Sequence, residues 1–411
     1  MKTTGLQKTR PVHKGRAILV AALLVLLWCS AACGASTGAS STHVAKHVRR
    51  TAQSADASGE FVSSVSMVGA GEGWAVAGGR LLWTNTNGES WSDITPAGAD
   101  IADGGVSFLN SQYGWVVDSD QYSVTVYRTS DGGADWQVSS TTVTRQTGGG
   151  ASLTFMSPST GWIDVPVVSS SNWPTGLLLK TVDGGRTWTD DTPRQIPPGF
   201  PFASGPIEFV SSTAGYLVGG PTNQLYESSD SGLSWSVVSL SPPSGYAGAT
   251  VEASAPPTVV GSDLVLPATL VRGNGAPTVQ AFYVSTDQGA SWAAAASSNS
   301  AAGTGDAFLP SFVGADNWYF SPGGSALIRY PASTPTQPGA PVSENVLPIA
   351  GGGEVTSIEF ASPSDGWALV RSESCASKSG GCSAVSDLET TSNGGATWTV
   401  VAVPVASPTD G

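Results

Sequence analysis

The stretch Thr181-Val182-Asp183-Gly184-Gly185-Arg186-Thr187-Trp188 decides the fold of this chain. Its composition is that of a tight turn, because an Asp side chain accepts hydrogen bonds from backbone N–H groups just downstream and Gly adopts positive φ without steric cost. The closing Trp begins the next strand, and its ring can pack back over the turn. We call this eight-residue segment and its copies the repeated turn.

The repeated turn recurs along the chain at a regular interval. The copies are Thr129–Trp136, Ser228–Trp235, Ser285–Trp292 and Thr391–Trp398, with a weaker copy, Thr84–Trp91, in which Thr86 takes the place of the Asp. Their starting residues lie 45, 52, 47 and 57 residues apart, and a gap of 106 residues precedes the last copy. That gap is about two periods long, so it hides one further repeat. Repeats of this length indicate an array or a propeller.

A second motif precedes each turn: an apolar-polar-apolar triplet, a short polar turn, and then a Gly-Trp pair. The pairs are Gly73-Trp74, Gly114-Trp115, Gly161-Trp162, Gly215-Tyr216, Asn317-Trp318 and Gly366-Trp367, and a degraded copy runs from Ser262 to Val265. Each repeat reads as four short β-rich segments separated by turn signals. Seven such repeats predict an all-β fold, a seven-bladed β-propeller with the repeated turn between the third and fourth strands of most blades.

The chain divides into four parts by composition. Residues 1–33 combine a basic start, a short apolar core and small residues before Cys33, which is typical of a lipoprotein-type signal peptide with Cys33 as the lipidated residue. Ordinary secretion and an uncleaved anchor remain alternatives. Residues 34–60 form a Ser/Ala/Gly-rich tether, 61–405 the propeller and 406–411 a tail. We therefore expect an exported protein, lipid-anchored on the extracytoplasmic face of a bacterial membrane.

Charge and histidine content exclude several classes of function. The net charge of −13 disfavours nucleic-acid binding, which depends on neutralising phosphates. The His residues are His13, His43 and His47, all before the propeller, so we expect neither a Ser-His-Asp triad nor a histidine-ligated metal. No cofactor is predicted. Cys375 and Cys382, in an exported chain, predict a disulfide that closes a small loop.

The repeated turn is similar to the Asp-box, or bacterial neuraminidase repeat. Its pairing with an upstream Ile-Glu-Phe and Gly-Trp pattern resembles the photosystem II assembly and stability factor family. The resemblance implies a propeller in which the turn residues Asp131, Asp183, Asp230, Asp287 and Asn393 are structural. It does not extend to sialidase catalysis, because the nearest string to the sialidase Arg-Ile-Pro segment, Arg194-Gln195-Ile196-Pro197, does not match.

The middle residue of each triplet is polar between apolar neighbours, so it points away from the blade packing. The seven residues are Ser66, Ser107, Thr154, Glu208, Thr258, Ser311 and Glu359. We predict that they form a ring lining the central channel, with Glu208 and Glu359 nearly opposite each other. Two carboxylates across a cleft are the arrangement used by glycosidases, whereas a wet channel also needs a polar lining and no chemistry. Asp118 and Asp164 form an alternative acid pair.

Loop composition suggests a separate binding surface. Arg194, Phe200 and Phe202 lie in a Pro-rich connection, and Arg with exposed aromatic residues is typical of interfaces. The same loop could instead pack on its own blade. The function we expect is a monomeric, membrane-tethered, non-enzymatic scaffold for a protein partner, as an assembly or stability factor for a membrane complex. The alternative is a glycoside hydrolase or a carbohydrate-binding propeller that acts on envelope or extracellular polysaccharide.

Overall fold

The computed structural model describes residues 62–101, 105–168, 175–193, 207–220, 222–273, 279–301, 309–313, 317–321, 326–331, 345–348, 353–375 and 382–404. All of them belong to the compact unit Ser41–Gly411. The elements assigned within these residues are β-strands, paired antiparallel. No helix among them is long and apolar enough to cross a membrane. The predicted signal peptide with Cys33, and the tether at 34–60, lie outside the described residues.

The strands form seven sheets, which we number in chain order. Sheets 1 to 4 each contain four consecutive strands: β1 Val62–Gly69, β2 Glu72–Ala77, β3 Arg80–Thr84 and β4 Ser92–Asp93; β5 Gly105–Phe108, β6 Gly114–Asp120, β7 Ser123–Thr129 and β8 Gln137–Thr142; β9 Ser152–Phe155, β10 Gly161–Val167, β11 Thr175–Thr181 and β12 Thr189–Asp190; β13 Ile207–Phe209, β14 Gly215–Gly219, β15 Gln224–Ser228 and β16 Ser236–Val237.

Sheet 5 contains five strands and sheets 6 and 7 contain four each. The strands are β17 Thr250–Ala253, β18 Thr258–Val260, β19 Asp263–Val271, β20 Val279–Ser285 and β21 Ala293–Ala301; β22 Leu309–Val313, β23 Asn317–Ser321, β24 Ala326–Pro331 and β25 Asn345–Pro348; β26 Glu354–Phe360, β27 Gly366–Cys375, β28 Cys382–Thr391 and β29 Thr399–Val401. Among the described residues, every sheet is built from strands that are consecutive in the chain, and no strand is exchanged between sheets.

The seven-bladed prediction is wrong in its blade count, although the all-β propeller class is correct. Six sheets are regular four-stranded blades, whereas sheet 5 departs from the pattern because β17 and β18 both pair with β19. Pro256 and Pro257 lie between these two short strands. A proline has no N–H to donate to a ladder, so the inner strand of this sheet is interrupted there.

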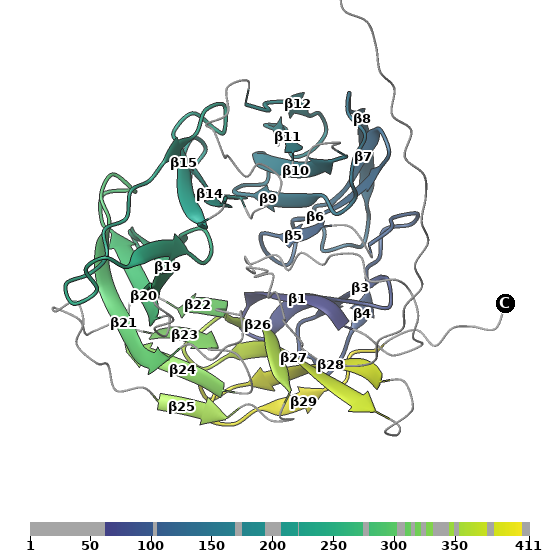
Figure 1. Ribbon diagram of the computed structural model, residues 1–411. Coiled ribbons are helices and arrows are strands. Elements are labelled where there is room, and N and C mark those ends of the chain that lie inside the picture. Colours follow the sequence, from purple (N-terminus) through teal and green to yellow (C-terminus); the bar gives the residue numbers. More distant parts are fainter. Residues whose placement is uncertain are drawn as a thin grey trace, which may run out of the picture. The chain divides into compact units, whose positions relative to one another are not determined.

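Each sheet packs on its neighbours in the chain, and Figure 1 shows the sheets following one another around a common centre. Sheet 7 also packs on sheet 1, in a cluster that includes Val65, Leu82, Trp367 and Leu388. The ring is therefore closed by side-chain contacts between the two ends of the propeller. The inner strands of the sheets border the centre.

The Gly-Trp pairs explain how neighbouring blades fit together. The Trp115 ring stacks on Phe155 of the next blade, with centroids 3.7 Å apart and planes 7° apart, and its indole N–H donates to the Gly184 carbonyl, 3.0 Å away, in that blade's repeated turn. Trp162 repeats both contacts, with Phe209 and with the Ser231 carbonyl. Each of these indoles therefore joins its own blade to the following one.

The Gly of the pair is required by the Phe of the triplet. A Cβ at Gly161 would lie 2.6 Å from the Phe155 ring, and a Cβ at Gly366 would lie equally close to Phe360. The register sets these contacts, because Phe155 pairs with Gly161 and Phe360 with Gly366 across the first two strands of each blade. The Phe is thus held between the Gly of its own blade and the preceding blade, which positions the inner strand beside the centre.

The repeated turn is held by its own side chains. Asp183 Oδ1 accepts hydrogen bonds from the backbone N–H groups of Arg186 and Thr187, at 3.0 and 2.9 Å, and from the Thr181 hydroxyl at 2.8 Å. The Thr181 oxygen in turn accepts from the Gly185 N–H at 2.9 Å. Gly184 and Gly185 have φ of 80° and 88°, the left-handed region that glycine adopts without strain.

Candidate functional site

The inner strands of several blades, together with sheet 5, enclose a cavity of about 360 Å³. Its carboxylates are those of Glu208 and Glu359, and Ser311 and Thr258 add hydroxyl groups. The remaining lining is mainly apolar: Met67, Phe155, Met156, Phe209, Val210, Ala255, Pro256, Pro257, Val259, Phe312, Ile358 and Phe360, with Ser357. Four of the seven residues predicted to form a channel ring therefore line one cavity.

Glu359 holds sheet 7 against sheet 1. Its Oε2 accepts a hydrogen bond from the Met67 backbone N–H at 2.7 Å and another from the Ser66 hydroxyl at 3.0 Å. The residue is 8% exposed. Both donors belong to the inner strand β1, so this carboxylate joins the last blade to the first at the point where the ring closes.

Ser311 makes the equivalent contact one interface earlier. Its Oγ accepts from the Phe360 N–H at 2.8 Å, which connects sheet 6 to sheet 7. At both interfaces the middle residue of one triplet accepts from the last residue of the next triplet. The polar middle position therefore satisfies buried backbone donors between neighbouring inner strands. Strand alternation predicted that these side chains face the centre, but no sequence pattern indicated that they also accept hydrogen bonds from the neighbouring blade.

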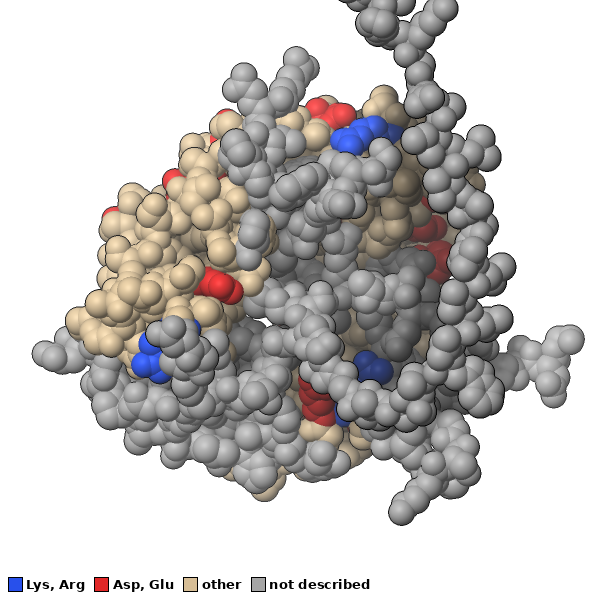
Figure 2. Space-filling model, viewed as in Figure 1, with Lys and Arg blue, Asp and Glu red and all other residues tan. Residues whose placement is uncertain are grey.

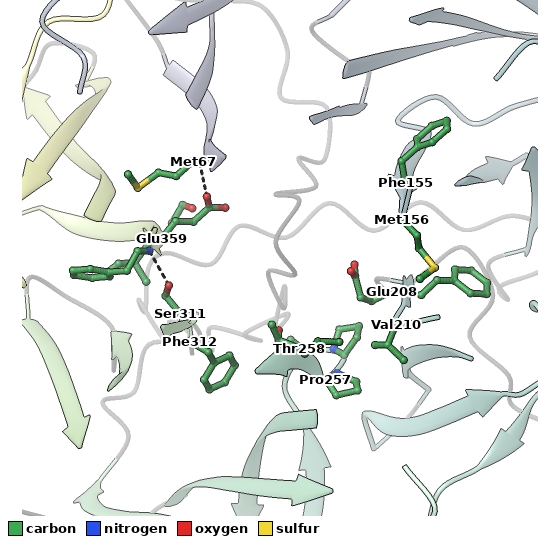
Figure 3. A pocket seen from close by; sticks show the side chains of 17 residues that line it. Met67, Phe155, Met156, Glu208, Val210, Pro257, Thr258, Ser311, Phe312 and Glu359 are labelled. Carbon is green, nitrogen blue, oxygen red and sulfur yellow. Dashed lines mark hydrogen bonds between the residues drawn. The ribbon is translucent and has the colours of Figure 1, made fainter. Parts of the chain in front are cut away.

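Glu208 lies on the other side of the cavity from Glu359. Figure 3 shows the two carboxylates approaching the cavity from opposite walls, with Glu359 turned toward Met67. Glu208 belongs to β13, where it pairs with Tyr216, and it is half-buried. Val259, another lining residue, is 51% exposed, so the cavity meets solvent beside β18.

Asp118 and Asp164, the alternative acid pair, do not line the cavity. Burial, reinforced by the nearby charges of Asp100 and Asp120, raises the pKa of Asp118, although hydrogen bonds from backbone N–H groups oppose the shift. Asp164 is 7% exposed within β10. The two residues lie on different sheets, β6 in sheet 2 and β10 in sheet 3, and neither lines the cavity that contains Glu208 and Glu359.

The Asp residues of the repeated turn lie away from the cavity and are committed to their own turns. Burial alone would raise the pKa of Asp183, but hydrogen bonds from the hydroxyl and N–H groups of Thr187 and from the Thr181 hydroxyl outweigh it and lower the pKa to about 2. The pKa of Asp230 is also lowered, because the equivalent hydrogen bonds outweigh the effect of burial. Hydrogen bonds are the main cause of the lowered pKa values of Asp131 and Asp287. Asn393 makes the same contacts with its amide: Oδ1 accepts from the Thr397 N–H and Nδ2 donates to the Thr397 hydroxyl.

Other predicted site residues fall partly or wholly outside the described structure. Arg194, Phe200 and Phe202 lie outside the described residues. Cys375 and Cys382 are cross-strand partners at the end of the β27–β28 hairpin, a backbone register that suits a disulfide. Within the described ranges, no group of three or more His, Cys, Asp or Glu residues is arranged to hold a metal ion.

The described charges are dispersed over the surface. On the face drawn in Figure 2, the coloured Lys, Arg, Asp and Glu residues appear in small, separate groups among the tan residues. One described ion pair joins Arg80 to Asp93 within sheet 1. Long basic side chains also lie over rings, with Lys180 Nζ 5.5 Å from the centroid of Trp162.

Solved structures of similar fold were found, although no protein-family model and no curated protein sequence matches this chain. The GH74 enzyme of Niastella koreensis is 12% identical, with 84% of this chain and 66% of that one covered and a TM-score of 0.52. YCF48 from Cyanidioschyzon merolae is 15% identical over 72% and 85% of the two chains, with a TM-score of 0.46. YCF48 bound to a D1 peptide is 16% identical over 72% and 79%, with a TM-score of 0.42. At these identities the comparison with the GH74 enzyme establishes a shared propeller fold and nothing about function.

Proposed function

We propose that this chain is a membrane-tethered extracytoplasmic β-propeller that binds a protein partner without catalysis. The observation that carries the proposal is the structural use of Glu359, whose Oε2 accepts two hydrogen bonds from sheet 1. A glycosidase needs two carboxylates that both address the scissile bond. Here one of the two cavity carboxylates, Glu359, holds the ring together.

The composition of the cavity supports recognition rather than hydrolysis. Phe155, Phe209 and Phe360, which line it, are packed into the blade interfaces and are not exposed platforms for a sugar ring. The Trp83 ring is likewise occupied, because it packs on Phe108 with ring centroids 5.1 Å apart. The resemblance of the repeats to photosystem II assembly factors makes an assembly or stability role for a membrane complex the sharpest form of the proposal.

The proposal is tested by capture from detergent-solubilised membranes with the affinity-tagged full chain as bait. A Cys33→Ser bait separates the contribution of the lipid anchor from that of the propeller. Recovery of one membrane complex by both baits supports the scaffold. If neither bait retains a protein and the full chain instead releases reducing sugar from envelope polysaccharide, the non-enzymatic proposal fails.

The second candidate is a glycoside hydrolase or a carbohydrate-binding propeller, and the position of Glu208 and Glu359 on opposite walls of one cavity favours it. Hydrolysis would require both side chains, so Glu208→Gln and Glu359→Gln should each abolish sugar release. If each variant retains the hydrolysis rate of the parent chain, these carboxylates do not catalyse the reaction.

A further inference from the structure

The outer strand of sheet 2 leaves one side of its backbone unpaired. Sheet 2 ends with β8, Gln137–Thr142, and among the described residues no strand pairs with the outer side of β8. Figure 1 shows β8 at the periphery of the ring, at the end of its sheet that lies away from the common centre. Such an edge presents a row of N–H and C=O groups to which another extended chain can pair.

The register of the ladder identifies the backbone groups of β8 that face outward. The Val143 N–H donates to the Tyr122 carbonyl at 2.8 Å, in direct continuation of the pairing between β7 and β8. Hydrogen-bonded and non-hydrogen-bonded pairs alternate along an antiparallel ladder, so every second residue counted back from Val143 is directed toward β7. The residues between them direct their N–H and C=O groups away from the sheet, and these are Val138, Ser140 and Thr142.

The outer strands of the other blades are shorter or irregular. β4, β12 and β16 contain two residues each and β29 contains three, and a proline follows each of them within five residues: Pro96, Pro193, Pro242 and Pro404. β25 has four residues and ends at Pro348, whereas β21 has nine but pairs with β20 through two register shifts. Short length, proline and bulges all protect an edge from pairing. β8 has six residues in unbroken register, without proline or charge, so its edge lacks these protections.

The charge beside β8 favours a basic group at one end of an added strand. Asp131 and Asp135 lie just before the first residue of β8, and both are exposed. Hydrogen bonds, first of all from the Asp135 N–H, hold the pKa of Asp131 below its ordinary value, so this carboxylate is ionised at neutral pH. Arg128 on the neighbouring strand β7 offsets one of the two carboxylates. A net negative charge therefore remains where the C-terminal end of an antiparallel added strand would lie.

We propose that the outer edge of β8 is a docking site for an extended segment of a partner protein, which adds an antiparallel strand to sheet 2 and has a basic residue at its C-terminal end. The outward backbone groups of Ser140 and its alternate neighbours form the ladder. Val138, which is 59% exposed, packs against an apolar side chain opposite it. The net charge of −13 on each copy disfavours a second copy of this chain as the occupant. The inference rests on the proposed protein-binding function, and it names the surface and the partner's conformation.

The test titrates the full chain with synthetic peptides by calorimetry at low salt. The probe is acetylated and amidated Thr-Val-Thr-Ser-Val-Thr-Lys-Lys, and one control is the same peptide methylated at its four central backbone nitrogens. We expect the methylated peptide to bind about tenfold more weakly, because it cannot donate to the edge of β8. A second control ends in Glu-Glu in place of Lys-Lys. It should also bind more weakly, and the difference should shrink as salt is added.

Ser140→Pro removes one outward N–H and leaves the bonds to β7 in place, since proline is tolerated on an edge strand where its nitrogen faces solvent. It should weaken binding of the probe about tenfold. Ser140→Ala is the matched control, because it loses the hydroxyl contact with Thr125 Oγ1 at 3.0 Å but keeps the N–H, and its binding should stay within about twofold of the parent. The melting temperature shows whether each variant is folded, and Thr142→Pro is a second variant of the same kind. In the parent chain, the probe should slow hydrogen exchange within Gln137–Thr142.

Several results would overturn the inference. Equal binding of the methylated and unmethylated peptides would mean that no ladder forms, and unchanged binding by a folded proline variant would place the peptide elsewhere, as would slowed exchange outside Gln137–Thr142. A dimer of the full chain in light scattering that Ser140→Pro abolishes would assign the edge to a second copy. If a folded Ser140→Pro bait still captures the membrane partner, the scaffold function survives and this inference fails. Binding of the probe at β8 without capture of a membrane partner would count against the scaffold function alone.

Discussion

Replacing Glu359 should show how much the propeller depends on the contact that closes its ring. The side chain joins sheet 7 to sheet 1 through Oε2, which accepts from the Met67 N–H at 2.7 Å and from the Ser66 hydroxyl at 3.0 Å. Glu359→Ala removes both bonds and leaves the buried Met67 N–H without this acceptor. Glu359→Gln keeps the shape and an acceptor oxygen but loses the charge.

The expected magnitudes follow from these contacts. A hydrogen bond to a charged group contributes about 1.5–3 kcal/mol, and an unsatisfied buried donor costs about 1–3 kcal/mol. Glu359→Ala should therefore lower the free energy of unfolding by about 3–5 kcal/mol. Because charge-assisted bonds are roughly twice as strong as neutral ones, Glu359→Gln should cost about 1–2 kcal/mol. Ser66→Ala removes one hydroxyl donor, and its coupling to Glu359→Ala should be about 0.5–3 kcal/mol.

Urea denaturation followed by tryptophan fluorescence measures these differences as shifts of the midpoint at constant m-value. Glu227→Ala provides the control, because Glu227 lies on β15 of sheet 4 and does not line the cavity. A substitution away from the ring-closing contacts is expected within about 0.5 kcal/mol of the parent. The reasoning is refuted if Glu359→Ala is no less stable than this control. It is also refuted if the effects of Glu359→Ala and Ser66→Ala simply add.

Three further measurements test other parts of the structure. Gly161→Ala would place a methyl group 2.6 Å from the Phe155 ring and should destabilise by about 1–3 kcal/mol in the same denaturation assay, whereas Gly273→Ala, with no neighbouring atom within 4 Å, should be neutral. The folded pKa of Asp183, about 2, lies below the ordinary value of 3.8, so its contribution to stability is present above about pH 4 and is lost as the pH falls toward 2. Asp183→Asn should therefore make the free energy of unfolding less dependent on pH between 4 and 2. An unchanged pH dependence would contradict the assignment. Cys375 and Cys382 should resist alkylation until a reductant is added, because a disulfide consumes both thiols. Prompt labelling of Cys375 and Cys382 themselves in the unfolded, unreduced chain, located by peptide mapping, would exclude the bond.

The fold class followed from the sequence because its signals are local and repeated. The turn residues and the Gly-Trp pairs each report on contacts within a few residues, so their spacing predicted four-stranded sheets in a ring. The irregular sheet 5 was missed because Pro256 and Pro257 interrupt a strand that hydrophobic alternation alone leaves continuous. The need for Gly at the Gly-Trp pair was also missed, since it comes from a Phe that becomes a neighbour only through strand register.

The central position of Glu208 and Glu359 was predictable, because strand alternation decides which face a residue occupies. The contact that Glu359 makes where the ring closes was not. Glu359 meets Ser66 and Met67, which lie almost 300 residues away in the chain, and no local pattern encodes that contact. The apolar wall contributed by Met156 was equally hidden, because Met156 follows β9 of sheet 3 and shares a cavity with Glu208 only when separate sheets converge.

The indole contact between blades has a direction, and this bears on how such chains arise. Trp115 and Trp162 each supply a donor to the following blade, while the turn carbonyl that accepts it belongs to the receiving blade. Each such repeat therefore supplies the indole donor at one interface and the carbonyl acceptor at the other. A duplicated repeat inserted in tandem brings both its donor and its acceptor, so the interfaces on its two sides are each complete. Duplication or deletion of a repeat can therefore lengthen or shorten such a ring one unit at a time. The number of units is then limited by the curvature needed to bring the ends together.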